Sequence, residues 1–293
     1  MRLGGGGDKD FFDLTGRRGG FGGGGGGNML GCLLPLVASR FGMVGVLILL
    51  LGYCALQSFG GGGILTGPET QSGDPRSSGQ SRLDPETARF LPAVLSSTDA
   101  VWTELFRANG RTYREPQMVA YTSGTQTACG FGQAAMGPFY CPTDSRIYLD
   151  PSFFKELQTR FRAAGDFAQA YVIAHEVGHH VQNLDGTLEQ ARSAQARAGK
   201  AEGNAIQVKV ELQADCYAGV WAAHAKAPDG TSALEPGDVE EGMRAAEAIG
   251  DDTLQRRSQG TVVPESFTHG TSAQRMAALR RGLETGDPAA CKF

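Results

Sequence analysis

Residues 171–182 read YVIAHEVGHHVQ, and the assignment of a fold to this chain starts from this stretch. Its apolar residues recur at helical spacing, which predicts an α-helix with a buried face. His175 and His179 are four positions apart, so they lie on one face of that helix about one turn from each other. Two imidazoles in this arrangement can bind one metal ion, and the pattern His-Glu-x-x-His is typical of a Zn²⁺ site.

Three carboxylates complete the predicted site. Glu176 follows the first histidine and would lie beside a water molecule at the metal, where it suits the role of general base. A catalytic zinc also needs a third protein ligand, and we expect Glu211, in a second predicted helix, to be that ligand. Asp215 lies one turn further along the same helix face and would accept the free N–H of a ligating histidine, His175.

Other interpretations of these residues remain open at this point. Asp185 competes as third ligand, but sites with that short spacing need a glycine where this sequence has Gln182. The two histidines could instead form hydrogen bonds at a helix surface, and the carboxylates of Glu211 and Asp215 could lie on a solvated helix face. The apolar residues on either side of both segments favour burial, where carboxylates need partners.

The N-terminal part of the chain differs sharply from the rest. Residues 1–40 are rich in glycine and predict a disordered arm. Residues 41–59 carry no charged side chain and are long enough to cross the hydrocarbon core, so they predict a single transmembrane helix. A buried core helix or a cleaved signal peptide are the alternatives, but the former would show a polar face and the latter would start near residue 1. Residues 60–84 predict a flexible linker and 85–293 one folded domain.

The distribution of Lys and Arg predicts how this helix is oriented. Five basic residues precede the apolar segment, and none follows it before Arg76; the five are Arg2, Lys9, Arg17, Arg18 and Arg40. The positive-inside rule therefore places the N-terminus in the cytoplasm and the folded domain in the periplasm or another extracytoplasmic space, anchored in the inner membrane. The net charge is −4 with scattered basic residues, so we expect the lipid bilayer but no nucleic acid as a partner.

Four of the six cysteines lie in the predicted outer domain. An even number in an extracytoplasmic domain suits two disulfide bonds. Cys129 and Cys141 would close a short loop, which we favour, and Cys216 with Cys291 would be the remaining pair. Free buried thiols are the alternative.

The folded domain is predicted to be α+β, with helices dominating after residue 150. Its predicted helices are at about 85–109 (broken near 96–97), 151–161, 166–184, 187–200, 203–226, 237–250 and 272–285. Two to four short strands are predicted between 116 and 150, among them 118–121 and 147–149.

The segments around the predicted site resemble those of the bacterial neutral zinc metallopeptidases. The resemblance rests on HEVGHHVQ at 175–182 and ELQADCYAG at 211–219, and it extends over nearly the whole chain. It implies a zincin-like fold, a single-pass membrane protein and peptidase activity. The Glu-x-x-x-Asp arrangement is also similar to that of gluzincins such as thermolysin, which supports Glu211 as third ligand. Gluzincins add a donor for the oxyanion of the reaction, and His269 is our candidate, with a surface or capping histidine as its alternative.

We therefore expect hydrolysis of peptide bonds in a peptide or protein substrate by a zinc-activated water, with Glu176 as general base. A zinc-stabilised binding or chaperone-like module without hydrolysis is the alternative from another class, and a zinc amidase acting on cell-wall peptides shares the chemistry. The strand at 147–149 is expected to offer a sheet edge to an extended substrate. We expect structural roles for His180, which points about 100° away from His179, and for the distant His224.

Overall fold

The computed structural model describes residues 1–7, 9–16 and 81–293. Within these ranges, no helix combines the length and the apolar character that a membrane crossing requires. The predicted transmembrane helix at 41–59 lies outside the described residues, as does nearly all of the predicted linker at 60–84.

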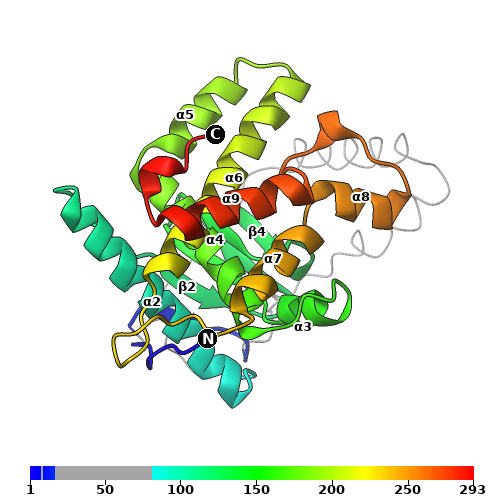
Figure 1. Ribbon diagram of the computed structural model, residues 1–293. Helices are drawn as coiled ribbons and strands as arrows, with labels where there is room; N and C mark the ends of the chain where they lie inside the picture. The colour runs from blue at the N-terminus through cyan, green and yellow to red at the C-terminus, as the bar shows by residue number, and fades with distance from the viewer. Residues whose placement is uncertain (8, 17–80) are drawn as a thin grey trace, which may run out of the picture. The chain divides into compact units, whose positions relative to one another are not determined.

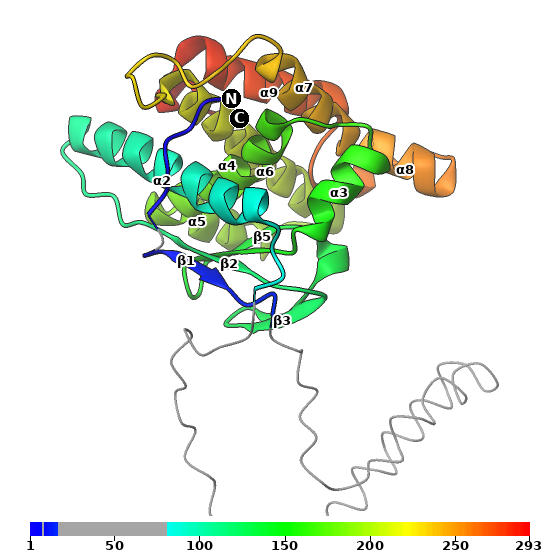
Figure 2. The ribbon, with the colours of Figure 1, turned by 90° about the horizontal axis from the view of Figure 1, so that it is seen from below.

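A small mixed sheet forms one side of the described unit (Figure 2). Its strands, in spatial order, are β1 (Phe11–Asp13), β2 (Gln117–Ala120), β6 (Arg146–Leu149) and β5 (Phe139–Cys141). β1, β2 and β6 run parallel to one another, and β5 runs antiparallel to β6. β3 (Gly124–Thr127) and β4 (Gly130–Gln133) form a separate hairpin. Side chains alternate between the two faces, so that Met118 and Ile147 join the main core whereas Val119 and Tyr148 join a smaller cluster.

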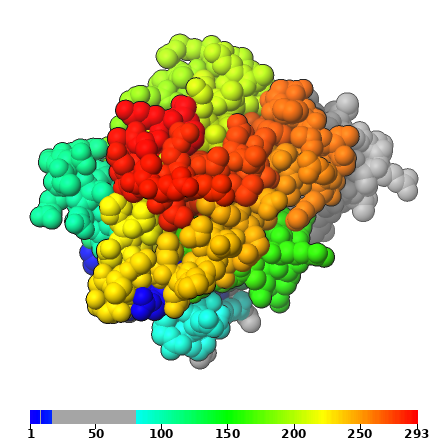
Figure 3. Space-filling view, viewed as in Figure 1, coloured from blue at the N-terminus to red at the C-terminus, as the bar shows by residue number. Residues whose placement is uncertain are grey.

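Helices cover the other side of the unit (Figures 1 and 2). They are α2 (Pro85–Ala108), α3 (Ser152–Thr159), α4 (Asp166–Leu184), α5 (Thr187–Gln195), α6 (Lys200–His224), α7 (Asp238–Ala248), α8 (Asp251–Gln259) and α9 (Ser272–Thr285). α4 lies at the centre and contacts α2, α5, α6, α7 and β5. α9 packs on α6 and α7 and forms part of the surface seen in Figure 3.

Two glycines set how closely the central helices approach. A Cβ on Gly178 of α4 would lie 3.0 Å from the Cα and carbonyl oxygen of Ala214 in α6, so even an alanine would require the two helix backbones to shift by a few tenths of an ångström. A Cβ on Gly219 of α6 would lie 2.2 Å from the carbonyl oxygen of Leu279 in α9. The small residues therefore bring α4, α6 and α9 together backbone against backbone.

The α+β class and most predicted elements are confirmed. α4 has the predicted bounds, and it ends where Gly186 takes a positive φ of 78°. α2 continues unbroken through 96–97, contrary to the prediction. α8 was not predicted, because its sequence DDTLQRRSQ is almost entirely polar and shows no apolar period.

The predicted disordered arm is wrong for its first part. Residues 1–7 and 9–16 are folded onto the domain, and β1 extends the sheet beside β2. Further upstream, the backbone N–H of Arg2 donates to the carbonyl oxygen of Ala233 at 2.7 Å. Glycine-rich composition hid a short apolar run, Phe11–Phe12, whose sheet partner lies about a hundred residues further along the chain. The rest of the predicted arm, 17–40, lies outside the described residues.

Both favoured disulfide pairs are confirmed. Cys129 pairs with Cys141 and Cys216 pairs with Cys291. The second bond joins α6 to the C-terminal end of the chain, where Gln213 also donates to the carbonyl oxygen of Cys291 at 2.8 Å. The bond that closes the longer loop restricts the unfolded chain more, so Cys216–Cys291 contributes the larger stabilisation.

Buried Asp99 in α2 provides a test of the packing against the sheet. Burial, and then the charges of Glu115 and Asp10, raise the pKa of Asp99 to about 8 from 3.8. The folded protein therefore holds a proton on Asp99 that the unfolded chain has lost, so stability falls as the pH rises from about 4 to about 8. In the Asp99→Asn variant, this contribution to the loss of stability with rising pH disappears.

Asparagine resembles the protonated acid, so Asp99→Asn should unfold at nearly the wild-type temperature below about pH 4, where the wild-type chain is protonated in both states, and at an increasingly higher one as the pH rises to 8.5. Each unit by which the pKa of Asp99 differs between the folded and unfolded states corresponds to about 1.4 kcal/mol of stability, or about 3–6 °C in Tm. Thermal unfolding of both proteins across this pH range measures the effect, and parallel pH profiles would contradict the buried, protonated Asp99.

Candidate metal centre

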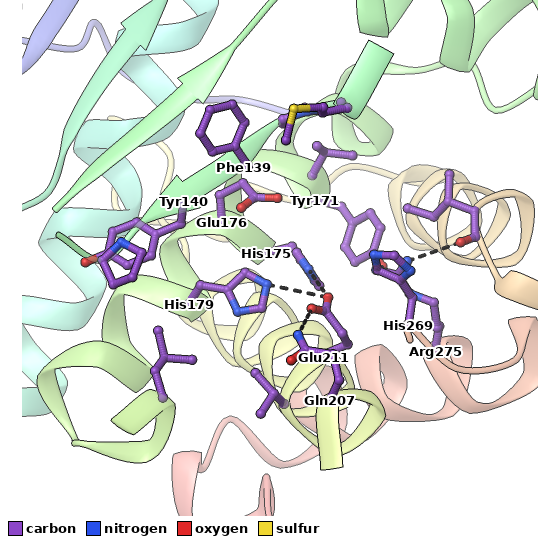
Figure 4. A pocket seen from close by; sticks show the side chains of 18 of the residues that line it. Phe139, Tyr140, Tyr171, His175, Glu176, His179, Gln207, Glu211, His269 and Arg275 are labelled. Atoms are coloured by element: carbon purple, nitrogen blue, oxygen red, sulfur yellow. Dashed lines mark hydrogen bonds and ion pairs between the residues drawn. The ribbon is translucent and has the colours of Figure 1, made fainter. Parts of the chain in front are cut away.

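Three side chains from two helices converge at the bottom of a cleft (Figure 4). His175 and His179 come from α4, and Glu211 comes from α6. Nε2 of His175 lies 3.2 Å from Oε2 of Glu211, and Nε2 of His179 lies 3.5 Å from the same oxygen. One ligand atom of each residue lies within 4.8 Å of the others. Two imidazole nitrogens and one carboxylate oxygen form a donor set that suits Zn²⁺ and leaves a position open.

The imidazole of His175 is oriented by a fully buried carboxylate. Its Nδ1 donates to Oδ1 of Asp215 at 2.7 Å, which leaves Nε2 for the metal. Tyr171 donates its hydroxyl to the same oxygen at 2.6 Å. The guanidinium of Arg275 binds both carboxylate oxygens of Asp215 at 2.9 Å and is itself buried. The predicted role of Asp215 toward His175 thus agrees with the geometry, and Arg275 balances its charge.

His179 and Glu211 are held by amide side chains. Nδ1 of His179 donates to Oε1 of Gln182 at 2.9 Å, and Gln182 is anchored by donating to the carbonyl oxygen of Val210 at 2.8 Å. Gln207 donates to Oε1 of Glu211 at 2.8 Å, so Oε2 is the oxygen that faces the two histidines. Each of the three candidate ligands therefore has one atom fixed by a neighbour and one atom directed at the site.

The electrostatics of the cluster favour a cation. Burial alone would lower the pKa of His175, but the charge and hydrogen bond of Asp215 outweigh it and raise the pKa to about 10. Burial would raise the pKa of Glu211, but the two neighbouring imidazoles hold it well below its usual range. Positive charge is therefore stabilised at this point of the protein. A divalent metal would take the place of the proton, as expected for a donor set that binds metal in its deprotonated form.

Glu176 and His269 line the same cleft, whose volume is about 510 Å³. In Figure 4, Glu176 lies on the other side of the two imidazoles from Glu211. His269 precedes α9, and its side chain is half exposed. Its Nδ1 lies 3.1 Å from Oδ1 of Asp251, the first residue of α8. Oδ2 of Asp251 also accepts the backbone N–H of His269 at 2.7 Å, so this carboxylate fixes both the loop and the ring.

The walls of the cleft are largely apolar. One side is contributed by the segment around β5 and by α3, and the other by α5, α6 and the start of α8. The apolar lining residues include Met136, Pro138, Phe139, Phe153, Phe161, Leu188, Ile249 and Leu254. Phe139 belongs to β5, the strand whose second edge is unpaired among the described strands.

The other candidates have structural positions. Asp185 forms an ion pair with Arg111 and is not part of the ligand cluster. His180 is buried with its Nε2 donating to the carbonyl oxygen of Arg114 at 2.6 Å, and burial lowers its pKa to about 4. His224 contacts the carbonyl oxygen of Gly286 at 2.8 Å. The expected substrate edge at 147–149 is wrong, because β6 is paired on both sides by β2 and β5.

Gln182, Gln207 and Arg275 were not predicted as parts of the site. Gln182 lies three residues after His179, and Gln207 lies four residues before Glu211, which are the spacings of one helix face. A search along the ligand-bearing faces could have found both. Arg275 lies sixty residues after its partner Asp215, on a different helix, and no local pattern identifies it.

Known proteins similar to this chain agree with the geometry. A sequence model of the family described as "Putative neutral zinc metallopeptidase" matches residues 7–293. "Uncharacterized protein YpfJ" of Escherichia coli strain K12 is 48% identical over 247 residues, which cover 84% of this chain and 83% of the relative. "Uncharacterized protein Rv2575" of Mycobacterium tuberculosis strain H37Rv is 42% identical over 225 residues, or 72% of this chain and 73% of the relative. No solved structure is significantly similar.

The role of Asp215 can be tested on metal binding. Asp215→Asn keeps the shape of the side chain but removes the charge that orients His175, so zinc affinity should fall about 10- to 100-fold. Competition with a chromophoric chelator measures this affinity. Asp185→Asn is the matched control on the rejected ligand position and should bind zinc like the wild type. An Asp215→Asn protein with wild-type affinity would contradict the assignment.

Proposed function

Because the chain belongs to the neutral zinc metallopeptidase family, we propose that it hydrolyses peptide bonds with Zn²⁺ held by His175, His179 and Glu211. The observation that carries the proposal is the convergence of these three anchored ligand atoms at the bottom of an open cleft, with Glu176 beside them. A metal that only stabilised the fold would need neither the adjacent carboxylate nor the opening to solvent.

The proposed roles follow from the positions of the side chains. The zinc ion, when bound, polarises the scissile carbonyl group and acidifies a water molecule. Glu176 accepts a proton from the attacking water and passes it to the leaving amine. His269 in its protonated form carries an N–H on both ring nitrogens, one directed at Asp251 and the other available to the oxyanion of the tetrahedral intermediate. Asp251 supports this charge and restricts the rotation of the ring.

The edge of β5 that has no partner among the described strands supports binding of an extended peptide. β5 lies beside α4, and its residues Phe139 and Tyr140 line the cleft. A substrate strand added to this edge would have its backbone ordered by main-chain hydrogen bonds. An edge strand next to a helix that carries both histidines, with the acidic ligand on a following helix, supports a zincin-like fold and the gluzincin assignment.

Two disulfide bonds support an extracytoplasmic location for the domain. The uncharged segment 41–59 supports attachment to the inner membrane. We propose that the peptidase acts at the outer face of that membrane.

The general base is tested by Glu176→Gln in the purified full-length protein. This variant should bind one zinc ion as the wild type does. It should lose nearly all hydrolysis of an unfolded protein substrate, because the amide of glutamine cannot accept the proton of the attacking water. Metal analysis and the appearance of new amino termini measure the two properties. Glu211→Gln is the contrasting variant and should lose zinc together with activity. Wild-type cleavage by Glu176→Gln would refute the mechanism.

Replacement of His269 by alanine should lower kcat about 10²- to 10³-fold with zinc content unchanged, as for removal of an oxyanion donor. His224→Ala removes a histidine that contacts Gly286 at the C-terminal end of α9, and this variant should retain wild-type kcat. Steady-state kinetics on one peptide compare the two variants. A His269→Ala enzyme whose KM rises while kcat stays constant would assign this residue to substrate binding instead.

A further inference from the structure

Strand β1 is part of the same sheet as the strands that follow the apolar segment. Phe11, Phe12 and Asp13 pair in parallel with residues 118–120 of β2. The backbone N–H of Met118 donates to the carbonyl oxygen of Asp10, and that of Leu14 donates to Ala120, both at 2.8 Å. The ladder therefore extends beyond the three paired residues at both ends.

Residues before β1 also contact the domain. Leu3 packs against the main core. A Cβ on Gly6 would lie 2.1 Å from the carbonyl oxygen of Pro92, so the backbone lies directly on α2. The N-terminal residues are thus held against the domain by specific contacts, although none of residues 1–7 is fully buried.

The described residues just before and just after 17–80 lie next to each other. Thr15 accepts the backbone N–H of Arg82 on its hydroxyl at 2.9 Å. The carbonyl oxygen of Thr15 accepts the hydroxyl of Thr122, just before β3, at 3.3 Å. The two ends of the intervening segment, 17–80, are therefore joined to each other and to the domain.

The compartment of this domain is indicated by its two disulfide bonds. Cys129–Cys141 links the β3–β4 turn to β5, in the sheet region that contains β1. Cys216–Cys291 lies beside the metal centre on α6. Disulfide bonds of this kind persist in oxidising compartments.

We infer that β1 and the metal centre lie on the same, oxidising side of the membrane. A chain that crossed once within 41–59 would separate β1 from β2 by the bilayer, and the hydrogen bonds between them could not form. Thr15 and Arg82, which flank residues 17–80 and are joined by a hydrogen bond, therefore lie together on that one side. This inference is independent of the proposed peptidase activity.

The charge rule predicts the opposite orientation from five basic residues, and two of these, Arg2 and Lys9, form contacts within the folded domain. The Arg2 guanidinium contacts the hydroxyl of Thr231 at 2.9 Å and the carboxylate of Asp229 at 3.4 Å. Lys9 forms ion pairs with Glu115 and Asp10. Basic groups paired within a folded domain are not free to determine which end of a helix stays in the cytoplasm.

The test uses the full-length protein in spheroplasts, with Cys32 and Cys54 replaced by serine. Lys9→Cys is treated with a membrane-impermeant maleimide before and after permeabilisation. Lys9 is 72% exposed and lies outside the metal centre. Lys155→Cys, on exposed α3, is the matched control for the domain. The account predicts equal labelling of both cysteines before permeabilisation, while a cytoplasmic marker protein stays unlabelled.

Labelling of Lys9→Cys only after permeabilisation, with Lys155→Cys labelled before it, would overturn the inference. If both cysteines require permeabilisation, the oxidising compartment is wrong. A second measurement covers the case in which a single cysteine fails to label. Phe12→Cys combined with Val119→Cys, which are register partners in β1 and β2, should form a disulfide bond in cells, found by mass spectrometry of unreduced peptides. Its absence, with both thiols free, would show that β1 does not pair with β2.

Discussion

The close packing of α4 on α6 is the constraint on which the rest of the structure depends. Gly178 lies between the two histidines and lets the backbone of α6 approach at Ala214. At that distance Glu211 reaches the imidazole nitrogens of α4, and Asp215 reaches the opposite ring nitrogen of His175. The spacing of four residues is used on both helices, so one helix contact aligns His175 and His179 with the third candidate ligand, Glu211. It also places Asp215 where it orients His175. A larger residue at Gly178 would push the backbones of α4 and α6 apart and so change the distance between the histidines and Glu211.

Burying this many charged groups is unfavourable unless each has partners. Asp215 is fully buried, and it is satisfied by Tyr171, His175 and Arg275. Arg275 comes from α9, which reaches it because Gly219 allows α9 to lie against α6. The same buried network that stabilises the core therefore determines which imidazole nitrogen faces the cleft. The residues that stabilise the core and those that orient the candidate ligands therefore belong to one network. The cleft lined by Glu176 is open to solvent beside this network.

Much of the site could be predicted from sequence, because the ligands and Asp215 are specified by spacing within single helices. Both disulfide pairs followed from loop length and elimination. Arg275 and Asp251 could not be predicted, since their partners lie on other helices and depend on tertiary packing. β1 was missed for the same reason, and polar α8 had no apolar period to reveal it. The predicted transmembrane helix at 41–59 lies outside the described residues, and the pairing of β1 with β2 argues against a single crossing there.

The central claim is that two imidazoles from α4 and one carboxylate from α6 bind zinc. X-ray absorption at the zinc edge of the purified full-length protein tests it most directly. The account predicts one zinc per chain with nitrogen and oxygen neighbours at about 2.0–2.1 Å and scattering from two imidazoles. Sulfur neighbours at about 2.3 Å, or a spectrum unchanged in a Glu211→Gln protein that keeps its zinc, would contradict it.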